Sequence, residues 1–277
     1  MALVIGTAPQ EGLVPARPRA PKRGEGARWH RLMLGGGFIV LFLLAWELSS
    51  RVGWIDPRFS SSPTRVVSML LRMLVDPVFW MHVQATATGF AVGWGISVVS
   101  ALLLGVSMGW YRLLRDALEP FFSALYAIPR SALMPLLLLW FGFGLTYKAI
   151  LVGLLAFFPL LLNTISGIRS ADATLIRMAR SFGADDRQLL WTVAIPGAVP
   201  FILTGLRQSA ALGLVGVIVG ELFSSSSGLG YLISNAAQTF QTDRVFAVIM
   251  VLAVVGLMLN ESLLRLEARL VLWQPRR

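Results

Sequence analysis

The chain of 277 residues contains no cysteine, only two histidines and few charged side chains. The lack of cysteine excludes disulfide bonds, thiol nucleophiles and metals held by thiolates. The two histidines, His30 and His82, lie far apart in the sequence, which argues against a histidine metal site. No cluster of acids and no nucleophile beside a base points to an enzyme. We therefore expect neither a cofactor nor a catalytic residue in this chain.

Charge is scarce as well, because only 14% of the residues are charged whereas soluble domains carry about 25%. Hydrophobic residues make up 56% of the chain and the mean hydropathy is +0.72. These values predict an all-α membrane protein whose main partner is the lipid bilayer. The net charge of +10 does not require a nucleic-acid partner, because the excess of basic residues on cytoplasmic segments of membrane proteins explains it.

Long apolar runs predict six transmembrane helices, since about 20 apolar residues are needed to cross a bilayer. The predicted spans are 32–50, 85–110, 118–141, 147–168, 199–223 and 245–263, the third of them interrupted by Pro120, Pro129 and Pro135. The predicted organisation is a disordered basic tail (1–31), a first helix with an outer interfacial segment (32–84), a main transmembrane domain (85–265) with a cytoplasmic loop at 170–198, and a cytoplasmic tail (266–277). The interfacial segment includes the amphipathic stretch TRVVSMLLRML.

The distribution of basic residues predicts the orientation. With the N-terminus inside, the cytoplasmic segments hold sixteen of the 24 Lys and Arg residues and the outer segments hold six. Both termini are therefore expected in the cytoplasm. The protein is predicted to cross the membrane several times.

The loop at 170–198 is unusually polar for this chain and reads as two short helices joined by a glycine. Asp172 can cap the first helix, and Asp185 or Asp186 can cap the second. Gly183 between them suits the left-handed residue that ends a helix. Pro196 and Pro200 are expected to end the second helix and to start the next span.

This loop resembles the cytoplasmic "EAA" loop of ABC-importer permeases, with the pattern E-A-A, three residues, G, nine residues, I-x-L-P. Arg177-Met178-Ala179 takes the place of E-A-A, and the spacing through Gly183 to Pro196 fits. Arg177 departs from the usual glutamate. The resemblance implies that the loop couples the chain to its ATPase, through Arg177, Ala179, Gly183, Ala184, Asp185, Ile195 and Pro196.

Four further motifs resemble the permeases of this family that serve sulfonates, taurine, nitrate and bicarbonate. They are AIPRSALMPLLLLWFGFG (127–144), FFPLLLNTISGI (157–168), TGLRQSAALGLVGVIVGEL (204–222) and GLGYLI (228–233). The resemblance implies a type I importer of the bacterial plasma (inner) membrane, with a separate ATPase dimer, an external substrate-binding protein and a second permease copy. The chain has no GxxxxGK[ST] loop for ATP of its own.

Charges inside the bilayer are costly and often functional, and three charged residues stand out in the predicted spans. Arg130, Arg207 and Glu221 are therefore candidates for the pore or its gate. For each of them the alternative is a structural role, as a side chain reaching an interface or as an ion pair between helices.

The resemblance implies transport of a small anion such as a sulfonate, taurine or nitrate. A pyrimidine or another vitamin precursor stays open, because related permeases look similar. An ion-coupled secondary carrier is a further alternative, although only Glu221 and Glu47 qualify as membrane carboxylates and no repeated halves are visible. Small residues spaced by four, as at Gly89 and Gly93, predict close helix packing without identifying a pore.

Overall fold

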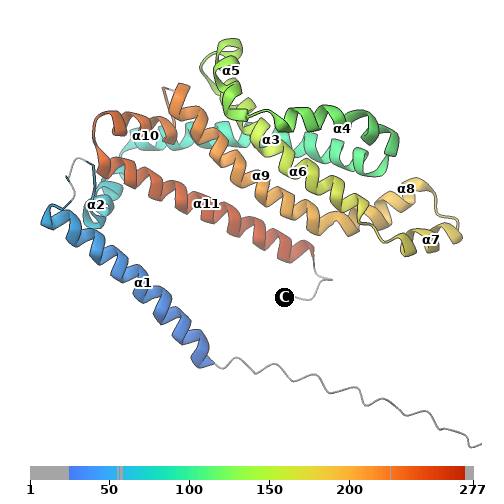
Figure 1. The fold of residues 1–277 in the computed structure, drawn as a ribbon, viewed down its shortest axis with the longest axis horizontal. Helices are drawn as coiled ribbons and strands as arrows, with labels where there is room; N and C mark the ends of the chain where they lie inside the picture. Colours follow the sequence, from blue (N-terminus) through green and yellow to red (C-terminus); the bar gives the residue numbers. More distant parts are fainter. Residues whose placement is uncertain (1–24, 55, 57–58, 225, 272–277) are drawn as a thin grey trace, which may run out of the picture. The chain divides into compact units, whose positions relative to one another are not determined.

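The computed structural model describes residues 25–54, 56, 59–224 and 226–271, and in these residues all regular structure is helical (Figure 1). The longer helices are α1 (Glu25–Val52), α3 (Pro77–Trp110), α4 (Arg112–Ala127), α6 (Leu145–Arg169), α9 (Ile195–Ser224) and α11 (Thr242–Leu270). The shorter elements are α2 (Pro63–Leu74), η1 (Arg130–Leu133), α5 (Met134–Phe141), α7 (Ala173–Ser181), α8 (Asp186–Leu189), η2 (Leu190–Ala194) and α10 (Leu229–Gln238). The predicted all-α class is confirmed.

Five helical stretches among the described residues are long and apolar enough to cross a membrane. They are Met33–Val52, Pro77–Trp110, Leu145–Arg169, Asp186–Phe223 and Thr242–Leu270. These five do not include the predicted third span, 118–141, which the sequence predicts to be interrupted by prolines. In the structure this stretch contains the end of α4, the 3₁₀ turn η1 and the short helix α5.

The break in this stretch follows from its prolines. Pro129 has no N–H to donate, and Ile128 before it is extended (φ −70°, ψ 127°), as the steric demand of a following proline favours. Gly142, with φ +65°, then ends α5. In Figure 1, α4 folds back beside α3 and α5 points away from both.

The two predicted tails lie only partly within the described residues. Residues 1–24 and 272–277 lie outside the described residues, but α1 begins at Glu25, within the predicted tail 1–31. At the other end, α11 continues to Leu270, past the predicted boundary at 266. The chain divides into two compact units at Leu48, and within the first unit the apolar side chains of α1 from Met33 onward are largely exposed, as in a helix that faces lipid.

Helix α6 is the centre of the second unit and packs against both α3 and α9 (Figure 1). The approach is close because glycines line the contacts. A Cβ atom added to Gly93 of α3 would lie 2.5 Å from the carbonyl oxygen of Ala149, and one added to Gly205 of α9 would lie 2.8 Å from Cβ of Asn163. The predicted packing role of the small-residue faces is confirmed for these helices.

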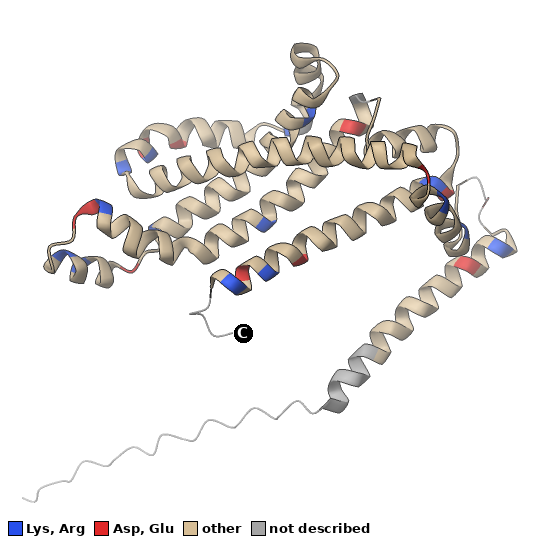
Figure 2. Ribbon diagram, turned by 180° about the vertical axis from the view of Figure 1, so that it is seen from behind, with Lys and Arg blue, Asp and Glu red and all other residues tan. Residues whose placement is uncertain are grey.

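Charged residues of the second unit gather near helix ends and in the connections, and the middles of the long helices are almost free of them (Figure 2). Buried positions include Leu151, Leu160 and Leu161 on α6, whereas many large apolar side chains on the other helices are exposed. This distribution is typical of a helical bundle that is surrounded by lipid.

Candidate functional site

The polar loop forms a compact elbow made of α7, a glycine turn and α8. Asp172 caps α7, since its Oδ1 accepts a hydrogen bond of 2.7 Å from the backbone N–H of Thr174. This hydrogen bond stabilises the carboxylate and lowers the pKa of Asp172 below its ordinary value. The cap that the sequence predicts is therefore present.

The turn after α7 is a Schellman motif, in which two backbone N–H groups close the last helical turn. The N–H of Ala184 donates to the carbonyl of Ala179 (3.1 Å), and the N–H of Gly183 donates to the carbonyl of Arg180 (2.9 Å). Gly183 has φ +84°, in the region where residues with a Cβ atom are strained. The Schellman turn therefore explains the spacing from Ala179 to Gly183, because the turn needs a left-handed residue at position 183.

The second helix begins with a capping box. Asp185 Oδ1 accepts from the N–H of Gln188 (2.7 Å), while Gln188 Oε1 accepts from the N–H of Asp185 (2.9 Å). Across the turn, Arg180 pairs with Asp186 at 2.8 Å, although both side chains are well exposed. Reciprocal capping fixes the direction in which α8 leaves the turn.

The expectation that Pro196 and Pro200 end this helix is wrong. The helical stretch runs without a break from Asp186 to Phe223, through the π-turn η2 into α9. At the end of this turn the N–H of Ile195 donates to the carbonyl of Leu190, five residues back. The wider π-turn makes room for the proline ring that follows, which would otherwise collide with the preceding turn.

The elbow is anchored in the bundle at this π-turn. Ile168 at the end of α6, Ala194 and Ala198 are fully or almost fully buried in one apolar cluster, against which Trp110 packs from the end of α3. The π-turn and the start of α9 therefore pack directly against the ends of α3 and α6.

Apolar side chains remain exposed on the elbow. Phe182 is 86% exposed, Trp191 62%, Met178 52% and Leu175 47%. A shallow groove of about 560 Å³ lies between α7 and the start of α9, lined in part by Met178, Phe182 and Pro196. Exposed aromatic and methionine side chains beside a groove are typical of a surface that a partner covers.

Arg177, which stands where the family motif carries glutamate, projects from the exposed face of α7. Its Nη2 donates to Thr174 Oγ1 of the same helix at 3.4 Å, and no ion pair is recorded for it in the described part of the chain. Its charge is therefore available to a partner.

Glu221 lies in a buried ionic cluster that joins three long helices. Its side chain is 0% exposed, and its Oε1 accepts from Lys148 Nζ of α6 at 2.9 Å. The ammonium also donates to the carbonyl of Ser227 at 2.8 Å. Glu221 thus makes an ion pair between two helices. Such an ion pair is the alternative to a pore role that the sequence leaves open for this residue.

The second carboxylate oxygen of Glu221 is equally engaged. Oε2 accepts from Thr86 Oγ1 of α3 (2.8 Å) and from the N–H of Gly230 (3.0 Å). Gly228 has φ +120°, and a Cβ atom added there would collide with the carboxyl group of Glu221. The GLG motif therefore wraps around the glutamate.

Sequence reasoning missed most of this cluster. No role was predicted for Lys148, which the structure places at 5% exposure inside α6. Thr86 carried no signal of its own. One sequence pattern could have indicated this ionic cluster. It consists of a lysine at the start of an apolar span and a glutamate that is followed by GLG.

The three charged candidates are not brought together. Arg207 pairs with Glu267 of α11 at 3.5 Å, also a helix-to-helix ion pair. The guanidinium of Arg130 lies over the rings of Tyr126 and Phe158, 5.0 and 5.1 Å from their centres, and its Nε is buried without a hydrogen-bond partner. Arg130, Arg207 and Glu221 therefore make separate contacts, and a role for any of them in the pore or its gate stays a prediction.

Membrane-crossing helices around a glycine-lined core, with a polar elbow extending from one of them, define a helical membrane transport component. Residues 97–271 match the family model described as "Binding-protein-dependent transport system inner membrane component". The match covers more than half of the chain, and the chain belongs to this family of inner-membrane permeases.

Named relatives are similar over most of their length. The chain is 32% identical to the taurine transport system permease protein TauC of Escherichia coli (strain K12), over 89% of this chain and 92% of the relative. It is 36% identical to the putative aliphatic sulfonates transport permease protein SsuC of the same organism (83% and 88%). It is also 32% identical to the formylaminopyrimidine transport permease protein ThiX of Halalkalibacterium halodurans (86% and 95%).

Proposed function

We propose that this chain is the permease subunit of an ATP-driven importer that takes up a small organic or inorganic anion of the sulfonate, taurine or nitrate type. A binding protein outside the cell delivers the anion, and a separate ATPase dimer supplies the energy. The observation that carries the coupling part of the proposal is the elbow, whose exposed apolar groove lies on a rigid extension of α9. The taurine and sulfonate relatives support the substrate class.

The second candidate substrate is a pyrimidine or another vitamin precursor, which the formylaminopyrimidine relative supports. Uptake of radiolabelled taurine and of a labelled pyrimidine, compared between the parent strain and a strain with the gene deleted, separates the two. If the deletion strain loses uptake of taurine but keeps uptake of the pyrimidine, the result supports an anion as the substrate.

A homodimer is part of the proposal. Helix α4 has no buried residue in the single chain, although it carries large exposed apolar side chains such as Phe121 (69% exposed) and Leu125 (49%). A second copy of the chain would cover this face. In the proposed orientation both termini and the elbow lie in the cytoplasm, where the ATPase dimer closes on ATP and pulls on α7 and α8.

Coupling is tested first at the turn. Gly183→Val is expected to abolish uptake while the protein still inserts, because valine costs about 1–3 kcal/mol in the left-handed conformation that the Schellman turn needs. A Cβ atom at this position meets no neighbour within 4 Å, so the effect would come from the backbone alone. Transport assays with protein levels measured by blotting report the result.

Gly183→Asn is the matched control, because asparagine tolerates the left-handed region. We expect this variant to keep at least half of the wild-type uptake. Wild-type uptake by the valine variant would refute the role of the turn in coupling.

The docking surface is tested at Phe182, the most exposed side chain of the elbow groove. Phe182→Asp is expected to reduce the amount of ATPase that co-purifies with the tagged chain in mild detergent about tenfold or more, since a buried interfacial aromatic is often worth 2 kcal/mol or more. Phe223→Asp, at a similarly exposed position (75%) at the far end of α9, is the control and should leave the ATPase bound. An unchanged yield of ATPase with Phe182→Asp would contradict docking at this groove.

A further inference from the structure

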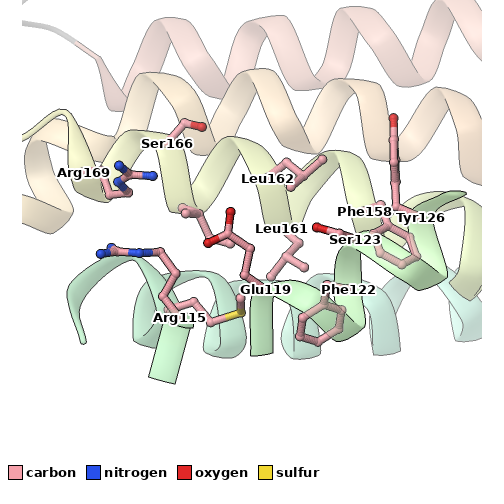
Figure 3. A pocket seen from close by; sticks show the side chains of 12 residues that line it. Arg115, Glu119, Phe122, Ser123, Tyr126, Phe158, Leu161, Leu162, Ser166 and Arg169 are labelled. Atoms are coloured by element: carbon pink, nitrogen blue, oxygen red, sulfur yellow. The ribbon is translucent and has the colours of Figure 1, made fainter. Parts of the chain in front are cut away.

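A cavity of about 280 Å³ lies between α4 and α6 and carries charges of both signs (Figure 3). Its lining includes the side chains of Arg115 and Glu119 from α4, Arg169 from the end of α6, and the rings of Tyr126 and Phe158. None of the residues of the elbow or of the Glu221 cluster takes part in it.

The charged groups are arranged in order along the cavity. Figure 3 shows the side chains of Arg115 and Arg169 extending toward the same end, with the carboxylate of Glu119 next to them and the aromatic rings at the other end. Two guanidinium groups can hold a tetrahedral or planar anionic head by charge-assisted hydrogen bonds. A carboxylate beside the two guanidinium groups can pair with an ammonium group of the same ligand, one or two carbon atoms away from its anionic head.

These charged groups lack close ion-pair partners in the described part of the chain. In the described part of the structure Glu119 and Arg169 make no ion pair, and the contact of Arg115 is a distant one of 3.8 Å to Asp116. The Arg115 side chain is only 18% exposed, so its charge is largely withdrawn from solvent. A largely buried guanidinium without a close counter-charge, as in Arg115, is costly and is usually kept for a ligand or a partner, whereas Glu119 and Arg169 are exposed beside it.

The cavity also lies at a suitable depth. Phe158 is near the middle of α6 and Arg169 is its last residue, so the cavity extends along about 16 Å of a membrane-crossing helix. Its other wall, α4, ends at the proline break before Arg130. Interrupted helices at membrane depth are tolerated where they line a cavity that holds water or solute.

We infer that this cavity is a solute-binding site in the inner half of the translocation path and that it selects a small zwitterion, with the anionic head on Arg115 and Arg169 and the ammonium on Glu119. The inference rests on the proposed function and narrows its substrate class from a plain anion to an anion that also carries an amine. The volume of the cavity admits a molecule of a few carbon atoms.

The test uses the full-length chain, purified with its ATPase and held in lipid nanodiscs, with binding measured by calorimetry up to 100 mM ligand. The probes are taurine, which carries both charges, ethanesulfonate, which carries only the anion, and ethylamine, which carries only the cation. We expect taurine to bind about tenfold or more tightly than either analogue, because only taurine makes charge-assisted contacts at both ends of the site.

Substitutions in the cavity show which side chains bind the anionic head of the ligand and which binds its ammonium group. Arg115→Gln and Arg169→Gln should each weaken taurine and ethanesulfonate about tenfold or more, whereas Glu119→Gln should weaken taurine alone. Arg112→Gln is the matched control, because Arg112 lies on the same helix with its side chain 86% exposed and outside the cavity. It should leave all three affinities unchanged.

Equal affinities for taurine and ethanesulfonate would indicate a plain anion site, such as one for a lipid phosphate, and would overturn the zwitterion assignment. The absence of saturable taurine binding, or an Arg115→Gln variant that binds like wild type, would overturn the site itself. ATPase co-purification is measured on the same samples. A complex that contains the ATPase but does not bind taurine refutes this inference alone, whereas a chain without ATPase refutes the proposed function.

Discussion

Glu221→Gln is expected to lower the free energy of unfolding by about 3–5 kcal/mol, because it leaves the ammonium of Lys148 buried without its counter-charge. The amide can still accept a hydrogen bond from Thr86 or from the N–H of Gly230, so the loss would come mainly from the charge. Denaturation with SDS, followed by tryptophan fluorescence, measures the change.

The matched variant is Lys148→Met in the Glu221→Gln background. Removal of the uncompensated ammonium should restore part of the lost stability, so the double variant should be more stable than the sum of the two single effects predicts. Strictly additive effects of the two substitutions would show that the ion pair does not hold α6 and α9 together.

The second large effect is expected at Gly93. Gly93→Val should destabilise the bundle by about 3 kcal/mol or more, because its Cβ would lie 2.5 Å from the carbonyl oxygen of Ala149 and 2.6 Å from Cβ of Val152. The backbone of α6 cannot move aside as a flexible side chain would. The fraction of protein that stays monodisperse after heating in detergent reports the loss.

Gly95→Val is the control on the same helix, since a Cβ atom at Gly95 meets nothing within 4 Å. We expect its stability to stay within about 0.5 kcal/mol of wild type. Similar losses at both positions would show that the helix tolerates no valine in this turn, whatever the packing, and would contradict the close contact between α3 and α6.

The glycine contacts extend along α6 away from the ionic cluster. Gly93 of α3 packs on Ala149, the residue next to Lys148, whereas Gly205 of α9 packs farther along α6 near Asn163. The elbow extends from the opposite end of α9. The bundle therefore has one end held by buried charges and the other end carrying the elbow.

The sequence alone determined the features that depend on composition and local spacing. The apolar runs predicted an all-α membrane protein, and the positions of Asp172, Gly183 and Asp185 predicted the caps and the turn of the elbow. Caps and glycine turns are set by residues within four or five positions of one another, so the local sequence specifies them.

Only the tertiary structure decided which charges meet and which helices cross. Lys148 and Glu221 are 73 residues apart, and no local pattern shows that α6 and α9 bring them to 2.9 Å. The same holds for Arg169 and Glu119, which line one cavity from two helices. The prolines of 118–141 predicted an interrupted span, but only the structure shows how α4, η1 and α5 divide it. Side-chain partners depend on how distant helices pack, and this packing is fixed by the shape of the whole bundle.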